Sequence, residues 1–278
     1  MSRPSDPLLR GLVDDAALFP PGNAPMDVAL AEHAGHRGAW YADMVGPFLA
    51  PASRVDELLA VLPADQRVGL SIVVDVSAEP ARDAFRRAVG DVRLTAVEAS
   101  HARLGNDATA VGAEVGGLAG VTGFLEVPQT DADAALDLVG TTGWYAAKYR
   151  TGGITADASP SEVQLAGFLV AAAARAIPFK LTAGLHHAVR NTDPATAFEQ
   201  HGVLNVLVAT RVAQQGGGVA EVAAVLAQRE PDPLVAFVQA WDEGTAVDVR
   251  RAFLSFGCCG VTDPIEDLVS LGVLEGAR

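Results

Sequence analysis

Cysteine is almost absent from this chain. Among 278 residues there are two, Cys258 and Cys259, and they are adjacent. Neighbouring cysteines cannot link distant parts of a chain, so a disulfide framework is excluded, and two small buried side chains are the favoured interpretation. Basic residues are also few: 20 Lys and Arg stand against 34 Asp and Glu, which gives a formal charge of −14. This balance argues against nucleic acid and against an anionic membrane as partners.

Long hydrophobic runs are missing too. The longest, Leu165 to Ala174, is far too short to cross a bilayer. The first seven residues contain no apolar segment of the kind that a signal peptide needs. We therefore expect a cytoplasmic protein.

The sequence has no recognisable nucleotide motif. Neither Gly216 to Gly218 nor Gly112 to Gly120 matches a P-loop or a dinucleotide fingerprint, and we predict no cofactor. Hydrophobic residues nevertheless make up 50% of the chain, enough for one large core.

Apolar strand-like runs and helical segments alternate about every 25–35 residues, which is typical of repeated βα units. We predict a single α/β domain over residues 1–278, a (β/α)8 TIM-type barrel. Residues 219–278 are expected to form a partly helical C-terminal addition. The eighth strand is either Val203–Thr210 or Phe253–Gly257, and the second is favoured. The other predicted strands are Gly11–Phe19, Asp43–Pro51, Val68–Val76, Val92–Ala99, Val121–Val127, Trp144–Arg150 and Pro178–Thr182.

The stretch from Trp144 to His187 is the most informative part of the chain. It reads as strand, helix, strand, the unit of a parallel sheet, and we expect Ser159 to cap the helix with Pro160 at its first position. Alternate residues of a strand share a face, so Lys148 lies with Arg150, and Lys180 with Thr182. A lysine is costly to bury unless its charge is paired or used. Each of the two strands also ends at a glycine turn. These cations therefore predict a site at the carboxyl ends of the strands.

Acids fall at the ends of the preceding strands. Glu98 and Glu126 are expected near the lysines as groups that pair with them or move protons, whereas Asp75 is expected to be a solvated strand end. His186 and His187 follow the second lysine, but adjacent residues of an extended chain point apart. We therefore predict contacts to substrate from them and no bound metal.

With the strands counted, the chain resembles the deoxyribose-phosphate aldolase group of class I aldolases. In that family a Lys-Thr-Ser-Thr-Gly-Phe strand carries the Schiff-base lysine, and the next strand carries a second lysine before Gly-Gly-Ile. Lys148 to Gly153, which includes Thr151 and Gly152, is similar to the first motif, and Lys180 to Leu185 to the second. Val13 to Leu18 is similar to the family's first strand, which adds Asp15 to the substrate-binding candidates. Arg150 stands where the family has a small hydroxyl residue, and the family's Gly-Ser-Ser phosphate loop is absent.

The first hypothesis is therefore a lyase of aldolase type that uses a Schiff base. A lysine at its ordinary pKa of about 10.4 is protonated at neutral pH and cannot attack a carbonyl. A neighbouring cation and partial desolvation favour the neutral amine, and Lys180 and Arg150 are placed to act on Lys148 in this way. The expected substrate is a small anionic carbonyl compound. Two alternatives stay open: a non-catalytic barrel that binds an acidic metabolite, and a metal-assisted lyase that uses Glu98, Glu126 and a histidine. The oligomeric state also stays open, with a homo-oligomer among the options.

Overall fold

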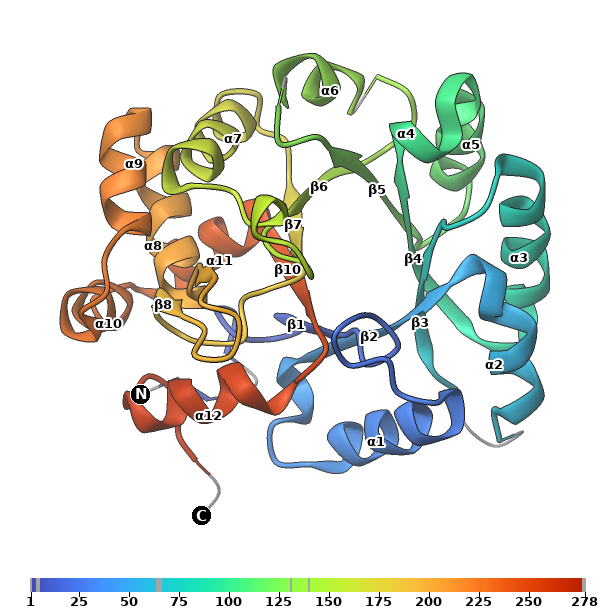
Figure 1. The fold of residues 1–278 in the computed structure, drawn as a ribbon, viewed down its shortest axis with the longest axis horizontal. Helices are drawn as coiled ribbons and strands as arrows, with labels where there is room; N and C mark the ends of the chain where they lie inside the picture. The colour runs from blue at the N-terminus through green and yellow to red at the C-terminus, as the bar shows by residue number, and fades with distance from the viewer. Residues whose placement is uncertain (1, 4–5, 64–66, 131, 140, 277–278) are drawn as a thin grey trace.

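Eight parallel strands close into a barrel, with helices around the outside (Figure 1). The computed structural model describes the whole chain except residues 1, 4–5, 64–66, 131, 140 and 277–278. The strand order around the barrel is β1-β10-β7-β6-β5-β4-β3-β2, and β2 pairs with β1 to close it. The predicted α/β barrel is therefore confirmed. The strands are β1 (Val13–Asp15), β2 (Val45–Pro51), β3 (Gly69–Val73), β4 (Arg93–Ser100), β5 (Thr122–Val127), β6 (Ala146–Arg150), β7 (Phe179–Thr182) and β10 (Phe253–Cys258).

The eighth strand of the barrel is the favoured candidate, β10, which lies between β7 and β1. The competing segment, Val203–Thr210, begins helix α8 (Val203–Gln214). All eight of its residues are buried, because the helix is covered on every side by its neighbours. A helix buried all round shows no polar face, so its sequence cannot be told from that of a buried strand.

The segment from residue 219 to residue 276 is partly helical and also supplies β10, which completes the barrel. α9 (Val219–Leu226), α10 (Pro231–Gln239) and α11 (Glu243–Ala252) come before β10 in the chain and pack against α8. They form an insertion between the last two strands of the barrel, and α12 (Thr262–Ser270) follows β10. The remaining helices are α1 (Met26–Gly38), α2 (Val55–Val61), α3 (Ala78–Asp91), α4 (His101–Leu104), α5 (Ala108–Gly116), α6 (Ala132–Leu138) and α7 (Glu162–Ala174), with short 3-10 turns at Ala42–Met44, Ala52–Arg54, Gly105–Asp107 and Ala156–Ala158.

The start of α7 corrects one expectation. Its cap is Ser161, not Ser159: the Ser161 hydroxyl accepts from the Gln164 amide at 3.3 Å, and the Gln164 side chain accepts from the Ser161 amide at 2.8 Å. This reciprocal pair satisfies two amides at the helix end, so the helix begins two residues later than predicted.

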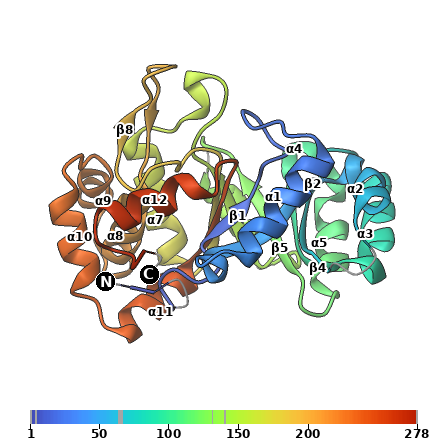
Figure 2. The ribbon, with the colours of Figure 1, turned by 90° about the horizontal axis from the view of Figure 1, so that it is seen from below.

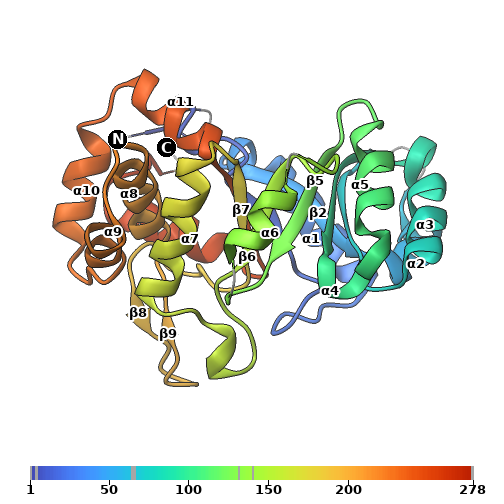
Figure 3. The same cartoon turned by 90° about the horizontal axis from the view of Figure 1, so that it is seen from above.

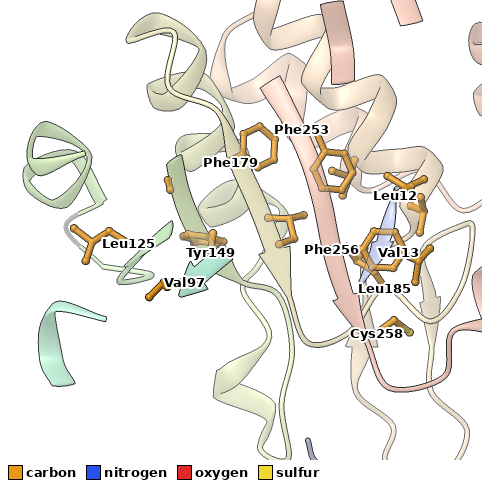
Figure 4. Packing of buried hydrophobic residues seen from close by; sticks show 14 of the residues in the cluster. Leu12, Val13, Val97, Leu125, Tyr149, Phe179, Leu185, Phe253, Phe256 and Cys258 are labelled. Atoms are coloured by element: carbon orange, nitrogen blue, oxygen red, sulfur yellow. The ribbon is translucent and has the colours of Figure 1, made fainter. Parts of the chain in front are cut away.

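Side-chain alternation on β6 decides what faces the interior. Tyr149 points outward and stacks on Phe168 of α7, with ring centroids 4.3 Å apart. Figure 4 shows Tyr149 among the buried hydrophobic side chains. Lys148 therefore points into the barrel. The interior below it is filled by a small apolar cluster that includes Ala96, Phe124 and Ala146. Lysines can sit inside this barrel only because acids from other strands meet them there.

One small hairpin was not predicted. β8 (Asn191–Thr192) and β9 (Glu199–Gln200) pair antiparallel in the segment between β7 and α8. Together with the segment between β6 and α7, the hairpin projects from one side of the barrel (Figures 2 and 3). That side is the carboxyl end of the strands, where βα loops build sites in barrels of this kind.

Candidate active site

A cavity of about 730 Å³ opens at the carboxyl end of the strands. Six of the predicted site residues line it: Lys148, Arg150, Gly152, Thr182, His186 and His187. Apolar side chains such as Phe19, Leu49 and Ile154 line other parts of its wall. This volume and this mixture of apolar wall and charged groups suit a small organic anion.

Lys180 lies deeper than the cavity, 1% exposed, inside the barrel. Its Nζ lies 2.6 Å from Oδ2 of Asp14 on β1 and 2.6 Å from Oε1 of Glu98 on β4. Burial alone would disfavour the ammonium, but these two carboxylates outweigh it and raise the pKa of Lys180 above its ordinary value. Lys180 is therefore a fixed cation in the barrel interior.

Glu98 connects the two lysines. Its Oε1 accepts from Lys180 and from the Ser71 hydroxyl at 2.8 Å, while its Oε2 lies 3.1 Å from the Lys148 Nζ. Burial of Glu98 works against ionisation, yet Lys180 and Lys148 together lower its pKa to about 2. Among the residues that the structure describes, Oε2 has no hydrogen-bond partner of good geometry. One oxygen of a firmly ionised carboxylate thus faces the Lys148 amine.

Asp14 is the weaker of the two buried acids. Burial raises its pKa, and Lys180 and the Ser255 hydroxyl, which donates to Asp14 at 2.7 Å, offset only part of that rise. The position of Asp14 depends on Lys180.

Lys148 lies between this interior network and the cavity. It pairs in register with Lys180 on β7 and with Glu126 on β5. Its Nζ is 3.3 Å from Glu126 Oε2, and the other oxygen of Glu126 is 3.7 Å from Arg150 Nε. Lys148 is 4% exposed, whereas 43% of the Arg150 side chain is exposed at the cavity. The lysine that a cavity ligand can reach is therefore Lys148.

Two predicted residues face elsewhere. The Asp15 carboxylate accepts from the Ala17 amide at 3.1 Å and bonds His33 Nδ1 on α1 at 2.9 Å, so it points to the helical layer. The acid that β1 contributes to the interior is Asp14, which the sequence analysis did not select. Thr151 donates its hydroxyl to the Ala183 carbonyl at 2.5 Å and does not line the cavity. Asp75 accepts hydrogen bonds from the Ser53 amide and hydroxyl at the surface, in keeping with the solvated strand end expected for it.

The adjacent histidines, which were expected to point apart, both reach α12. His186 Nδ1 is 2.8 Å from Asp263 Oδ2, and His187 Nδ1 is 3.1 Å from Asp267 Oδ2, one turn further along α12. These pairs tie the segment after β7 to α12. Within the described part of the chain, no three His, Cys, Asp or Glu side chains are grouped so that they could hold a metal ion. The glutamates of the metal-assisted hypothesis instead face Lys148.

No protein-family model matches the chain, and none of the curated proteins or solved structures compared with it matches either. In the described residues, no helix combines the length and the apolar character needed to span a membrane. What the site does must therefore follow from its own geometry.

Proposed function

We propose that the protein is an enzyme of imine chemistry, a lyase of aldolase type, in which Lys148 forms a Schiff base with a small anionic carbonyl compound. The observation that carries the proposal is the position of Lys148: its amine borders the cavity, with carboxylate oxygens of Glu98 and Glu126 at 3.1 and 3.3 Å. An amine that attacks a carbonyl must first lose a proton, and Glu126 Oε2 is within reach to take it.

The proton transfers of the reaction can be assigned to the groups around Lys148. The Lys148 ammonium gives a proton to a carboxylate, and the free amine attacks the carbonyl carbon. The carbonyl oxygen takes one proton from the attacking nitrogen and one from that carboxyl group and leaves as water, and a cationic imine remains. This imine draws the electron pair of an adjacent C–C bond as that bond breaks, while a carboxylate accepts the proton of the hydroxyl that becomes the second carbonyl. The enamine that results takes this proton at carbon, and water hydrolyses the imine, which releases the first carbonyl product and returns Lys148 as its ammonium. Glu126, 24% exposed beside the cavity, is the better placed acid for that second proton.

Lys180 acts through Glu98. Bound to Oε1, it fixes the carboxylate whose other oxygen faces Lys148. Arg150 offers its exposed guanidinium to the anionic group of the substrate.

Borohydride reduction tests the proposal directly. The protein is incubated with a panel of small aldehydes and ketones that carry a carboxylate or a phosphate, then reduced, digested and mapped by mass spectrometry. We expect the adduct on Lys148. It should be abolished in Lys148→Arg, which keeps the charge between the glutamates, and weakened in Lys180→Met.

Two other outcomes have defined meanings. An adduct on Lys180 would reverse the two roles. A protein that binds anionic carbonyl compounds yet never forms an adduct would refute imine chemistry and favour the non-catalytic barrel, in which the same cations simply hold an acidic metabolite.

A further inference from the structure

A second group of reactive side chains borders the same cavity, away from the lysines. Cys259 follows β10, His186 follows β7, and Asp263 lies in the first turn of α12. All three line the cavity. The Cys259 Sγ lies 3.6 Å from His186 Nε2, and His186 Nδ1 lies 2.8 Å from Asp263 Oδ2. This is the order nucleophile, base, orienting acid.

The carboxylate decides the tautomer of His186. An ionised Asp263 can only accept, so the Nδ1 of His186 must carry its hydrogen. The other ring nitrogen, Nε2, faces the Cys259 sulfur. Hydrogen bonds to the Cys258 and Cys259 sulfurs and to Asp263 raise the pKa of His186 to about 12. The imidazole is thus placed to take and hold the proton that the Cys259 thiol gives up.

The adjacent cysteine does not share this role. Cys258 is 1% exposed, and burial raises the pKa of its thiol. Its sulfur donates to the Gly260 carbonyl at 3.2 Å, and it lies 3.6 Å from Nδ1 of His186, the nitrogen already bound to Asp263. Of the two thiols, the one that faces both the proton acceptor and the cavity is Cys259.

The loop that carries His186 is held in an unfavourable conformation. Ala183, Gly184 and Leu185 all have positive φ, of 59°, 79° and 59°. Left-handed backbone is unfavourable for a residue with a side chain, and such strain tends to occur where a functional side chain must be held in one orientation. The loops after β6 and β7 contact each other at Gly152 and Gly184. A Cβ atom added to Gly152 would lie only 3.1 Å from the Gly184 amide nitrogen, so the absence of side chains allows this close approach. The loop conformation therefore brings His186 to the cavity rim.

We propose that Cys259 is a second nucleophile, activated by His186 with Asp263 as the positioning residue, and that it accepts acyl groups from small activated esters or thioesters. The thiol proton passes to His186 Nε2 as sulfur attacks the acyl carbon. The bond to the leaving alcohol or thiol breaks, and that group takes the proton from His186. Water then attacks the Cys259 thioester, its proton goes to His186, and the C–S bond breaks with return of the proton to sulfur.

Labelling of the intact protein tests this. p-Nitrophenyl acetate is the acylating probe, with iodoacetamide as a second probe of thiol reactivity, and labelled peptides are identified by mass spectrometry. We expect an acetyl group on Cys259, a burst of p-nitrophenol followed by slower turnover, and loss of both in Cys259→Ser. Cys258→Ser should leave the rates unchanged.

A matched pair of variants separates chemistry from loop structure. His186→Asn and Asp267→Asn each remove a tie between the loop and α12, but His186 faces the thiol, whereas Asp267 binds His187 and the Ala188 amide. We expect His186→Asn to slow Cys259 acylation at pH 7 on the order of 10²-fold and Asp267→Asn to change it little. Asp263→Asn should shift the pH dependence of alkylation, and Asp263→Glu should restore it. Equal rates in His186→Asn and Asp267→Asn, or labelling of Cys259 no faster than that of a free small-molecule thiol, would overturn the proposal. The acyl label and the borohydride adduct fall on different peptides, so this proposal and the imine proposal can fail separately.

Discussion

Replacing Lys180 by Met should be the most damaging single change inside the barrel, and the structure indicates its size. At an effective dielectric constant of about 20, unit charges 2.6 Å apart attract by roughly 6 kcal/mol, and Lys180 makes two such contacts. Much of that attraction only offsets the several kcal/mol that each buried ion loses by leaving water. Met fills a similar volume but leaves Asp14 and Glu98 without their common cation. We expect unfolding to become easier by about 3–5 kcal/mol, the range for breaking a buried ion pair.

The loss should depend on pH in a defined direction. Lys180 lowers the pKa of Asp14, which burial already raises, so Met at 180 removes the lowering influence. A carboxyl whose folded-state pKa lies above its unfolded value binds protons more readily in the native state, so the variant should gain stability as pH falls through that folded value. Wild type should gain less than the variant between pH 7 and pH 5, because Lys180 still offsets part of the rise in the Asp14 pKa. Its raised Lys180 pKa contributes stability throughout that range, and the contribution of Glu98 is lost only below its ordinary pKa of 4.5, toward about 2.

Urea denaturation followed by the fluorescence of buried Trp144 gives the free energy of unfolding at both pH values. The control is the double variant Lys180→Met with Asp14→Asn, in which the stranded charge is also removed. It should recover at least 1–2 kcal/mol relative to Lys180→Met alone. A single variant that loses less than about 1 kcal/mol, or loses the same amount at pH 5 and pH 7, would show that the buried network does not carry this energy.

Two further predictions concern the edges of the site and the packing behind it. Arg150→Gln should weaken the binding of anionic carbonyl compounds about tenfold, measured by titration calorimetry. The free energy of unfolding in urea should change by no more than about 0.5 kcal/mol, because the side chain is 43% exposed and lies 3.7 Å from Glu126. Unchanged affinity would remove Arg150 from the site. Gly143→Ala should destabilise the protein by roughly 2 kcal/mol or more, since φ is +86° and the new Cβ would meet the Gly112 carbonyl oxygen at 2.4 Å. Gly167→Ala should stabilise it by about 0.5–1 kcal/mol, because the new Cβ inside α7 would meet nothing within 4 Å. Melting temperatures of the two variants that shift in the same direction would contradict this prediction.

The barrel itself could be predicted because its signals are periodic. Apolar runs at regular intervals mark the strands, and alternation within β6 puts Lys148 and Tyr149 on opposite faces, as observed. Glu98 and Glu126 were found by the same reasoning, from their places at the ends of β4 and β5. What the sequence left open was a segment without a period: buried α8 shows no polar face that would separate it from a strand.

Periodicity alone could not predict whether Asp14 or Asp15 faces the barrel interior. Alternation says that these neighbours face opposite sides of β1, but not which of them faces inward. Both are buried, at 2% and 1% exposure, so neither stands out as solvated. The decision comes from partners far away in the sequence: Lys180 lies across the barrel from Asp14, and His33 on α1 meets Asp15. A similarity to a family's first strand could not replace that information.

The cluster of Cys259, His186 and Asp263 could not be predicted from the sequence for a related reason. Cys259, His186 and Asp263 lie on loops and a helix end, where neither the twofold period of strands nor the 3.6-residue period of helices applies. Their meeting depends on β10 entering the barrel beside β7, which brings the turn before α12 against the loop after β7. Strands fix the lysines and acids rigidly in the interior, while the loops above can vary without disturbing that frame. Groups at two depths of one cavity can therefore carry different chemistry, and only the deeper set leaves a pattern in the sequence.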